Sequence, residues 1–257
     1  MTRTTAAPPV AIQFDRVSKW FGGKSVDAGA FRAVDGLTLD IAEGEMVALL
    51  GKTGCGKSTT FNLIAGLMEP SEGTVRVQGL DPFKNFNDLR GKIAVVFQND
   101  RLLPWRTAIG NVELGLEMLE KPAPERHEVA QLWLSRLGLA GHEHDYPHAL
   151  SGGMRQRVSI ARAFATDASI LLCDEPFSAL DEITGQRLRE EFASLVRENG
   201  KTAVFITHSI NEALQIGNRI VVMTRPAKIA YDVRLGSQTT PERNDAIRAC
   251  IQDVLAA

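Results

Sequence analysis

The stretch GKTGCGKST, residues 51–59, constrains the fold of this chain more than any other. It matches the pattern G-x-x-x-x-G-K-[ST], and it lies between an apolar run, MVALL (46–50), and a helix-like run, TTFNLIAGLM (59–68). Glycines let successive backbone N–H groups converge on phosphate oxygens, and a helix start adds partial positive charge. A strand, a loop and a helix in this order predict a phosphate-binding loop.

The loop supplies most of the predicted nucleotide contacts. The alternative, a chance glycine-rich turn, is poor because the strand, the loop and the helix follow one another in the expected order. The predicted contacts are Gly51, Lys52, Thr53, Gly54, Cys55, Gly56, Lys57, Ser58 and Thr59. Lys57 is expected to reach the β- and γ-phosphates, and the Ser58 hydroxyl to bind Mg²⁺.

Two further apolar runs, SILLC (169–173) and TAVFIT (202–207), also end in polar residues. Apolar strands separated by helices predict an α/β fold with a mostly parallel sheet covered on both faces. Ligands of such sheets bind at the carboxyl ends of the strands. Gly51, Asp174 and His208 are therefore expected at that edge.

The polar residues after these strands are expected to take part in hydrolysis of the bound nucleotide. Asp174 is predicted to hold Mg²⁺, and Glu175 to orient and deprotonate the attacking water. Gln98 ends the run IAVVFQ, and His208 is expected to donate a hydrogen bond to the γ-phosphate. Residues 209–212 form a capping box that holds the histidine. The alternatives are a solvated turn for the two acids and structural roles for Gln98 and His208.

The rest of the chain predicts appended parts. Residues 11–45 and 73–80 contain short alternating strands, which indicate a small antiparallel sheet, and residues from about 100 to 165 read as a helical insertion. Residues 22–31 are expected to form an exposed hairpin loop. The segment from Thr240 onward reads as a capped helix with an apolar stripe, which docks on its own core or on a partner. That stripe contains Ile247, Ile251 and Leu255.

Composition excludes some functions. The formal net charge of −2 gives no reason to expect nucleic acid as a partner. No apolar run approaches the roughly 18 residues of a membrane-spanning helix, and the first nine residues lack the apolar core of a signal peptide and are expected to be a disordered tail. Cys55 and Cys173 are expected to fill space.

A second helix start has the features of an anion site. In ALSGGMRQRVSIARA (149–163), a serine and two glycines precede a helix. Its expected apolar face is Met154, Val158, Ala161 and Ala165. Such a start offers N–H groups and a dipole to an anion, whereas its arginines, Arg155, Arg157 and Arg162, are expected to be solvated or structural.

In this order the motifs resemble those of the ATP-binding subunit of an ABC transporter, over nearly the whole chain. The corresponding motifs are Walker A (51–59), the Q-loop (Gln98), the signature LSGGM (150–154), Walker B with the catalytic glutamate (ILLCDE, 170–175), the D-loop (SALD, 178–181) and the switch histidine (His208). The departures are Thr53 where serine is commoner, Met154 where glutamine is usual, and Ser209 where aspartate usually follows the histidine.

The resemblance implies a P-loop NTPase (RecA-like) core and a dimer. Two subunits pack head to tail, and each ATP lies between the P-loop of one and Ser151, Gly152 and Gly153 of the other. Phe21 falls where the family stacks an aromatic on adenine, with Trp20 or a core-packing role as alternatives. The implied catalytic residues are Glu175, His208, Gln98 and Lys57, and the implied Mg²⁺ ligands are Ser58, Gln98 and Asp174.

The implied layout is a single ABC ATPase domain over residues 10–257, after the tail of residues 1–9. Residues 10–99 and 166–224 form the catalytic core with its antiparallel sheet, residues 100–165 a helical subdomain, and residues 225–257 an accessory segment. Leu102, Leu103 and Trp105 are expected to be exposed and to contact a polytopic membrane permease; the alternative is that they anchor the inserted helices.

The stretches LLPW, LSGGMRQRV and MTRPAKIAYDVRL (223–235) are similar to those of the importer subfamily for nitrate, sulfonates and taurine. The expected protein hydrolyses ATP at the cytoplasmic face of the inner membrane, as a peripheral homodimer beside a permease and a separate solute-binding protein. The alternatives are a soluble ABC ATPase and a P-loop kinase, although a kinase has no need of LSGGM.

Overall fold

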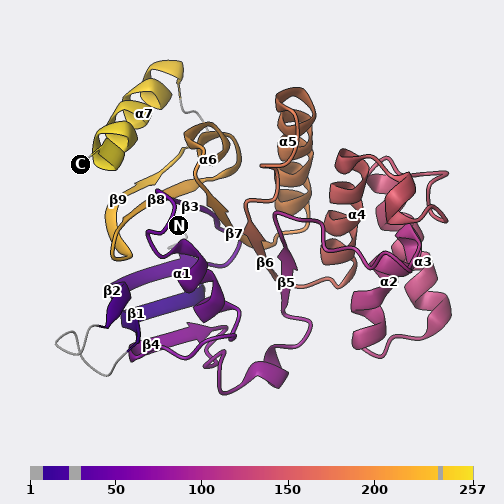
Figure 1. Ribbon diagram of the computed structural model, residues 1–257, viewed down its shortest axis with the longest axis horizontal. Coiled ribbons are helices and arrows are strands. Elements are labelled where there is room, and N and C mark those ends of the chain that lie inside the picture. The colour runs from indigo at the N-terminus through magenta and orange to yellow at the C-terminus, as the bar shows by residue number, and fades with distance from the viewer. Residues whose placement is uncertain (1–7, 23–29, 237–239, 257) are drawn as a thin grey trace, which may run out of the picture. The chain divides into compact units, whose positions relative to one another are not determined.

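The computed structural model describes residues 8–22, 30–236 and 240–256. They fall into two compact units: unit 1 holds residues 1–88 and 200–257, and unit 2 holds residues 89–199 (Figure 1). The predicted tail of residues 1–9 and the predicted loop of residues 22–31 lie mostly outside the described residues.

Unit 1 contains most of the strands. They are β1 (Val10–Phe21), β2 (Phe31–Ala42), β3 (Met46–Leu50), β4 (Glu72–Val77), β7 (Thr202–Thr207), β8 (Arg219–Thr224) and β9 (Lys228–Arg234). Its helices are α1 (Lys57–Ile64), α6 (Ile210–Ile216) and α7 (Pro241–Ala256). Unit 2 contains β5 (Ile93–Val96), β6 (Ile170–Asp174), α2 (Ala108–Met118), α3 (Ala123–Arg136), α4 (Gly152–Ala165) and α5 (Glu182–Glu198). Short 3₁₀ turns occur at Phe86–Leu89 and Pro147–Ala149.

The predicted antiparallel sheet is present in unit 1, with the strand order β2-β1-β4. β1 and β2 each run for 12 residues, so the expectation of short strands was wrong for this pair. They pair from Val10 and Ala42 at one end to Phe21 and Phe31 at the other, with several register shifts. The pairing extends both strands beyond the short segments that the alternating pattern predicts.

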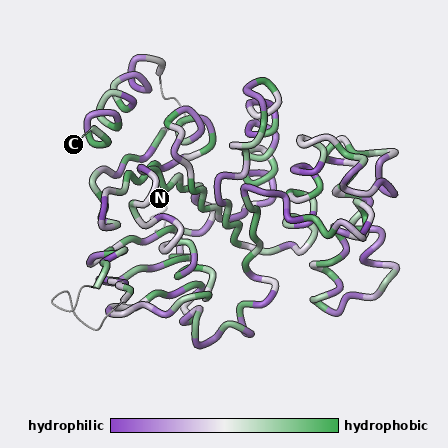
Figure 2. The backbone as a smooth tube through the Cα atoms, viewed as in Figure 1, coloured by the Kyte–Doolittle hydropathy of each residue, from purple (hydrophilic) through white to green (hydrophobic). Residues whose placement is uncertain are grey.

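The parallel part of unit 1 has the order β7-β3-β8, and β9 is antiparallel at its edge. All five residues of β3 and all six of β7 are buried, which agrees with strands covered on both faces. Figure 2 shows these strands as mostly hydrophobic. Leu50 and Thr207, the last residues of β3 and β7, are partners in the ladder.

Unit 2 contains the predicted helices of residues 100–165, together with the parallel pair β5 and β6. Phe164 of α4 is central to its core. Its ring lies 4.9 Å from that of Trp133 on α3 and 5.5 Å from that of Phe192 on α5, measured between centroids. Over the part of the chain that the structure describes, no helix is both long and apolar enough to cross a membrane.

The C-terminal helix α7 docks on its own unit, beside β8, β9 and α6 (Figure 1). Ile247 and Ile251 are buried against Ala48, Leu50 and neighbouring side chains, and Leu255 packs at the edge of this cluster. The predicted apolar stripe is confirmed. The Thr240 hydroxyl accepts the N–H of Arg243, as expected of a helix cap.

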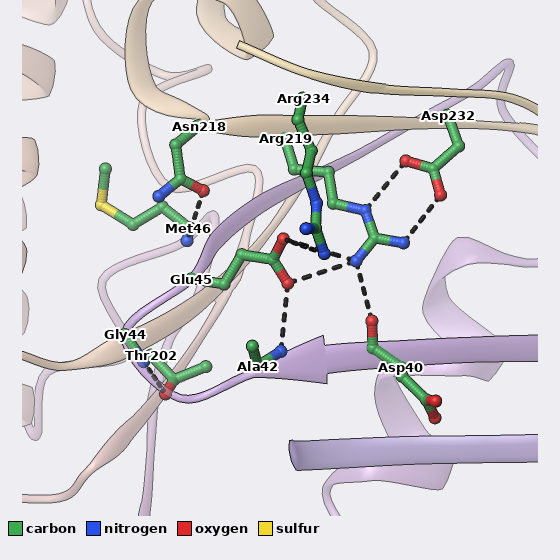
Figure 3. Close-up of polar contacts among 10 residues, drawn as sticks. All are labelled: Asp40, Ala42, Gly44, Glu45, Met46, Thr202, Asn218, Arg219, Asp232 and Arg234. Atoms are coloured by element: carbon green, nitrogen blue, oxygen red, sulfur yellow. Dashed lines mark hydrogen bonds and ion pairs between the residues drawn. The ribbon is translucent and has the colours of Figure 1, made fainter. Parts of the chain in front are cut away.

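An ion-pair network joins the amino ends of β3 and β8 to β9 (Figure 3). Arg219, whose side chain is 10% exposed, donates two hydrogen bonds to the Asp232 carboxylate at 2.8 and 2.7 Å. It also donates to the Asp40 carbonyl at 2.8 Å and contacts the Glu45 carboxylate at 3.2 Å. Arg234 reaches the same Glu45 at 3.3 Å from a mostly exposed position. The network fixes the end of the sheet opposite the phosphate loop.

Candidate functional site

The phosphate loop follows β3 directly and leads into α1, as predicted. Gly56 at the cap of α1 has φ of 104°, a conformation that side chains rarely adopt, and a Cβ there would lie 2.5 Å from the Ala33 carbonyl oxygen. Gly56 also has no side chain with which to cap the first N–H groups of α1. The helix start is therefore suited to an anion.

α1 is shorter than the predicted run of residues 59–68, since its last residue is Ile64. Gly66 has φ of 70°, and the N–H of Leu67 bonds back to the Asn62 carbonyl at 2.9 Å. A left-handed glycine with this bond ends a helix, so the prediction extended the helix too far.

Lys57 lies folded into the loop. Its ammonium donates to the carbonyls of Gly51 at 2.6 Å and Lys52 at 3.0 Å, and the residue is only 6% exposed. Cys55 is also buried, with its sulfur 3.9 Å from this ammonium. A cation held at the centre of a loop of backbone N–H groups fits the binding of polyphosphate. The exposed Ser58 hydroxyl follows, as a site for a metal ion would need.

His208 and the phosphate loop follow two strand residues that are paired with each other in the sheet. Gly51 and His208 each come one residue after the Leu50–Thr207 pair, and His208 is exposed. Ser209 caps α6, because its hydroxyl accepts the N–H of Glu212 at 3.3 Å, which confirms one arm of the predicted capping box. The structure thus brings together the residues predicted from β3 and β7.

Phe21 lies at the end of β1 and is 40% exposed. It pairs with Phe31, close in the chain to Ala33, whose carbonyl lies against Gly56 of the phosphate loop. Trp20 is half-buried, with the Arg32 guanidinium over its ring. Phe21 therefore offers more exposed ring surface than Trp20.

In unit 2, the other predicted residues follow β5 and β6. Val96 and Cys173 are partners in this parallel pair, and Gln98 and Glu175 each come two residues after them. Asp174 is the last residue of β6. Cys173 is wholly buried, and burial beside Asp174 raises the pKa of its thiol, so it packs as an apolar residue, as predicted.

The backbone at Glu175 is unusual. Its φ is 46°, a left-handed conformation that a residue other than glycine adopts at some cost in energy. No sequence signal other than the two acids after a strand marks this residue. Because of this conformation the chain turns at Glu175, directly after the last residue of β6, and does not continue as a strand.

The second predicted helix start is also present. Ser151 caps α4, with its hydroxyl accepting the N–H of Met154 at 3.3 Å, and Ser151 and Gly152 are both exposed. The expected face of α4 is buried at Val158, Ala161 and Ala165 and half-buried at Met154. Farther along, Asp181 caps α5 and accepts the N–H of Thr184, which holds the pKa of Asp181 below its ordinary value.

Polar residues of α4 hold the residues on both sides of Gln98. Arg155 donates to the Asp100 carboxylate at 3.0 Å, Arg162 donates to the Asp100 carbonyl at 2.8 Å, and Gln156 donates to the Phe97 carbonyl at 3.3 Å. Sequence reasoning classed the arginines as solvated or structural, and these contacts make Arg155 and Arg162 structural. It did not find Gln156, which is 4% exposed and carries no signal in its spacing.

The predicted exposure of the LLPW segment is only partly correct. Trp105 is 71% exposed, but Leu102 is 8% exposed and Leu103 is half-buried. The buried side chain of Asn111 on α2 holds the backbone of Leu103, since it accepts the Leu103 N–H at 2.7 Å and donates to the Leu103 carbonyl at 3.2 Å. The leucines therefore anchor the segment, as the alternative stated.

A phosphate loop that follows a buried strand of a mostly parallel sheet and leads into a helix defines a P-loop nucleotide-binding protein. The family model described as "ABC transporter" matches residues 34–178, more than half of the chain. The chain belongs to the ABC transporter family, and it is an ATP-binding, ATP-hydrolysing subunit of that family.

Relatives and solved structures agree. An ABC transporter ATP-binding protein of Methanocaldococcus jannaschii, MJ0412, is 40% identical over 91% of this chain and 85% of its own length. The taurine import ATP-binding protein TauB of Yersinia pestis is 44% identical over 75% of this chain and 74% of its own. The dimeric structure of the ATP-binding cassette MJ0796 bound to ADP and Pi covers 88% of this chain and 99% of its own, with a TM-score of 0.76 and 35% identity.

Proposed function

We propose that this chain powers the import of a small solute of the taurine, sulfonate or nitrate class through a separate membrane permease. ATP draws two copies of the chain together, and hydrolysis releases them. The chain then lies peripherally at the cytoplasmic face of the inner membrane, and a separate binding protein selects the solute. The similarity to the taurine import protein supports the class of solute.

The observation that carries the proposal is a second anion-binding helix start in one chain. The phosphate loop at α1 offers one site for an anion, and we propose that the start of α4, where Ser151 and Gly152 are exposed and Gly153 is half-buried, offers another. We propose that this second start binds the γ-phosphate of the ATP held by the partner copy. A head-to-tail pair closes with two shared sites, and the dimeric form of a 35% identical cassette supports it.

We propose the following roles within each site. Lys57 and the loop N–H groups bind the phosphates, Phe21 stacks on adenine, and Glu175 acts as general base. His208 bonds the γ-phosphate. The Ser58 hydroxyl, the Asp174 carboxylate and the Gln98 amide hold Mg²⁺, because these oxygen donors suit a small hard cation that neutralises phosphate charge.

We further propose the layout of a catalytic core (10–99 and 166–224), a helical subdomain (100–165) and an accessory segment (225–257). The permease contact is centred on Trp105, whose indole is exposed beside the anchored Leu102 and Leu103.

The test traps the complex. A tagged Glu175→Gln chain is expressed in its native cell, supplied with ATP, extracted gently with its membranes, and analysed by mass spectrometry. A polytopic membrane protein in about equal amount to the chain supports the transporter assignment. Lys57→Ala, which is expected not to bind ATP, is the control. Recovery of soluble partners alone contradicts coupling to transport and favours a soluble ABC ATPase.

A further inference from the structure

Strand β7 ends in a buried hydroxyl immediately before the exposed His208. Thr207 is 3% exposed. Its Oγ1 donates to the Glu212 carboxylate at 2.6 Å and accepts the N–H of Ser209 at 3.0 Å. The Ser209 hydroxyl accepts the N–H of Glu212 at 3.3 Å. These bonds form a closed loop that spans residue 208 from both sides.

The direction of these bonds follows from chemistry. An ionised carboxylate only accepts hydrogen bonds, so the single proton of the Thr207 hydroxyl points to Glu212 and its lone pairs remain for the Ser209 N–H. Bonds to a carboxylate are shorter and stronger than neutral ones. Glu212 lies in the first turn of α6, where negative charge is favoured. The backbone on either side of His208 is therefore held by one carboxylate acting through one hydroxyl.

We infer that Thr207 and Glu212 are positioning residues that hold His208 in the orientation in which it meets the γ-phosphate. The inference rests on the proposed role of His208. Packing alone does not explain the hydroxyl, because the four preceding residues of β7, Ala203 to Ile206, are apolar and equally buried.

The same strand provides a matched control. Thr202, at the opposite end of β7, is also 3% exposed, and its hydroxyl accepts the N–H of Gly44 at 3.0 Å (Figure 3). Valine has nearly the same shape as threonine, so replacement of either threonine by valine removes one buried hydroxyl from this strand and little else. Only the change at residue 207 releases His208.

The experiment measures ATP hydrolysis by the full chain, with labelled γ-phosphate for sensitivity. Thr207→Val is expected to lower kcat about tenfold or more, with the KM for ATP changed by less than about twofold, since misplacement of a catalytic group acts on the chemical step. Thr207→Ser keeps the hydroxyl and is expected to restore activity. Thr202→Val is expected to lower the melting temperature to a similar extent without the loss of kcat.

A second background tests whether the threonine acts through the histidine. In a His208→Ala chain, Thr207→Val is expected to cause no further loss, because residues that act as a unit are not additive. The imidazole Cε1–Hε1 NMR signal of His208, assigned by its absence in His208→Ala, is expected to shift in Thr207→Val and to stay in place in Thr202→Val.

Three results overturn the inference: equal loss from Thr207→Val in both backgrounds, equal loss from Thr202→Val, or an unmoved His208 signal. If His208→Ala itself hydrolyses ATP at the full rate, the proposed role of the histidine fails and the inference fails with it. If His208→Ala is inactive while Thr207→Val is fully active, the inference alone fails.

Discussion

Gly56 is the residue of the phosphate loop with the least room for change. It has φ of 104°, and an added Cβ would lie 2.5 Å from the Ala33 carbonyl oxygen and 2.7 Å from the Ala227 Cβ. Gly56→Ala is expected to reduce the free energy of unfolding by about 2–5 kcal/mol and to abolish ATP binding, from strain and overpacking together. Denaturant unfolding and fluorescent-ATP titration measure the two effects.

Gly79→Ala is the control for strain alone. Gly79 has φ of 79°, and a Cβ there would meet no atom of the described residues within 4 Å. The expected loss is about 1–2 kcal/mol with ATP binding unchanged. Equal effects of the two substitutions would contradict the role of close contact at Gly56.

Arg219 is the second residue whose replacement has a large expected effect. Arg219→Met leaves the Glu45 and Asp232 carboxylates without their shared guanidinium, and the free energy of unfolding is expected to fall by about 3 kcal/mol. Arg234→Ala removes a mostly exposed partner of the same Glu45 and is expected to cost less than about 1 kcal/mol. Urea unfolding distinguishes them, and a larger effect at Arg234 would reverse the assignment of the central residue.

At the scale of elements, α7 is a separately docked cover on one face of the unit 1 sheet. Its buried contacts come mainly from Ile247 and Ile251. Ile251→Ala is expected to weaken docking by about 2–4 kcal/mol, so that the amides of α7 exchange with solvent faster while those of β3 and β7 do not change. Hydrogen exchange measures this. Gln252→Ala, on the exposed side, is the control, and uniform acceleration through unit 1 would show that α7 is part of the global core.

Elements with strong local signals were predicted from the sequence. The runs MVALL and TAVFIT are β3 and β7 at the predicted residues, and serine caps begin α4 and α6 as expected. The length of β1 and β2 was missed because it depends on pairing with each other. The placement of Leu103 was missed because its backbone is held by Asn111, a polar residue on another element. The left-handed Glu175 and the bonds of Thr207 are tertiary features without a local pattern.

At the scale of the whole molecule, the proposed dimer depends on the start of α4. In the Glu175→Gln background, Ser151→Arg is expected to bind ATP normally but to remain a monomer, because an arginine side chain fills the space meant for the partner's γ-phosphate. Sedimentation with ATP and fluorescent-ATP titration provide the two measurements. Ser151→Ala removes only the cap, at about 1 kcal/mol, and is the control. Loss of ATP binding in Ser151→Arg would show that this segment folds the domain and does not serve a second copy.

The shared rung of β3 and β7 has a consequence for how such chains diverge. The phosphate loop and His208 leave the sheet from the paired residues Leu50 and Thr207, so a ladder of backbone hydrogen bonds sets their spacing. Loops and appended helices can gain or lose residues without disturbing it. One residue inserted within either strand would invert the faces of every side chain beyond it. Related chains are therefore expected to keep this site when their loops differ in length, provided that β3 and β7 keep the same number of residues.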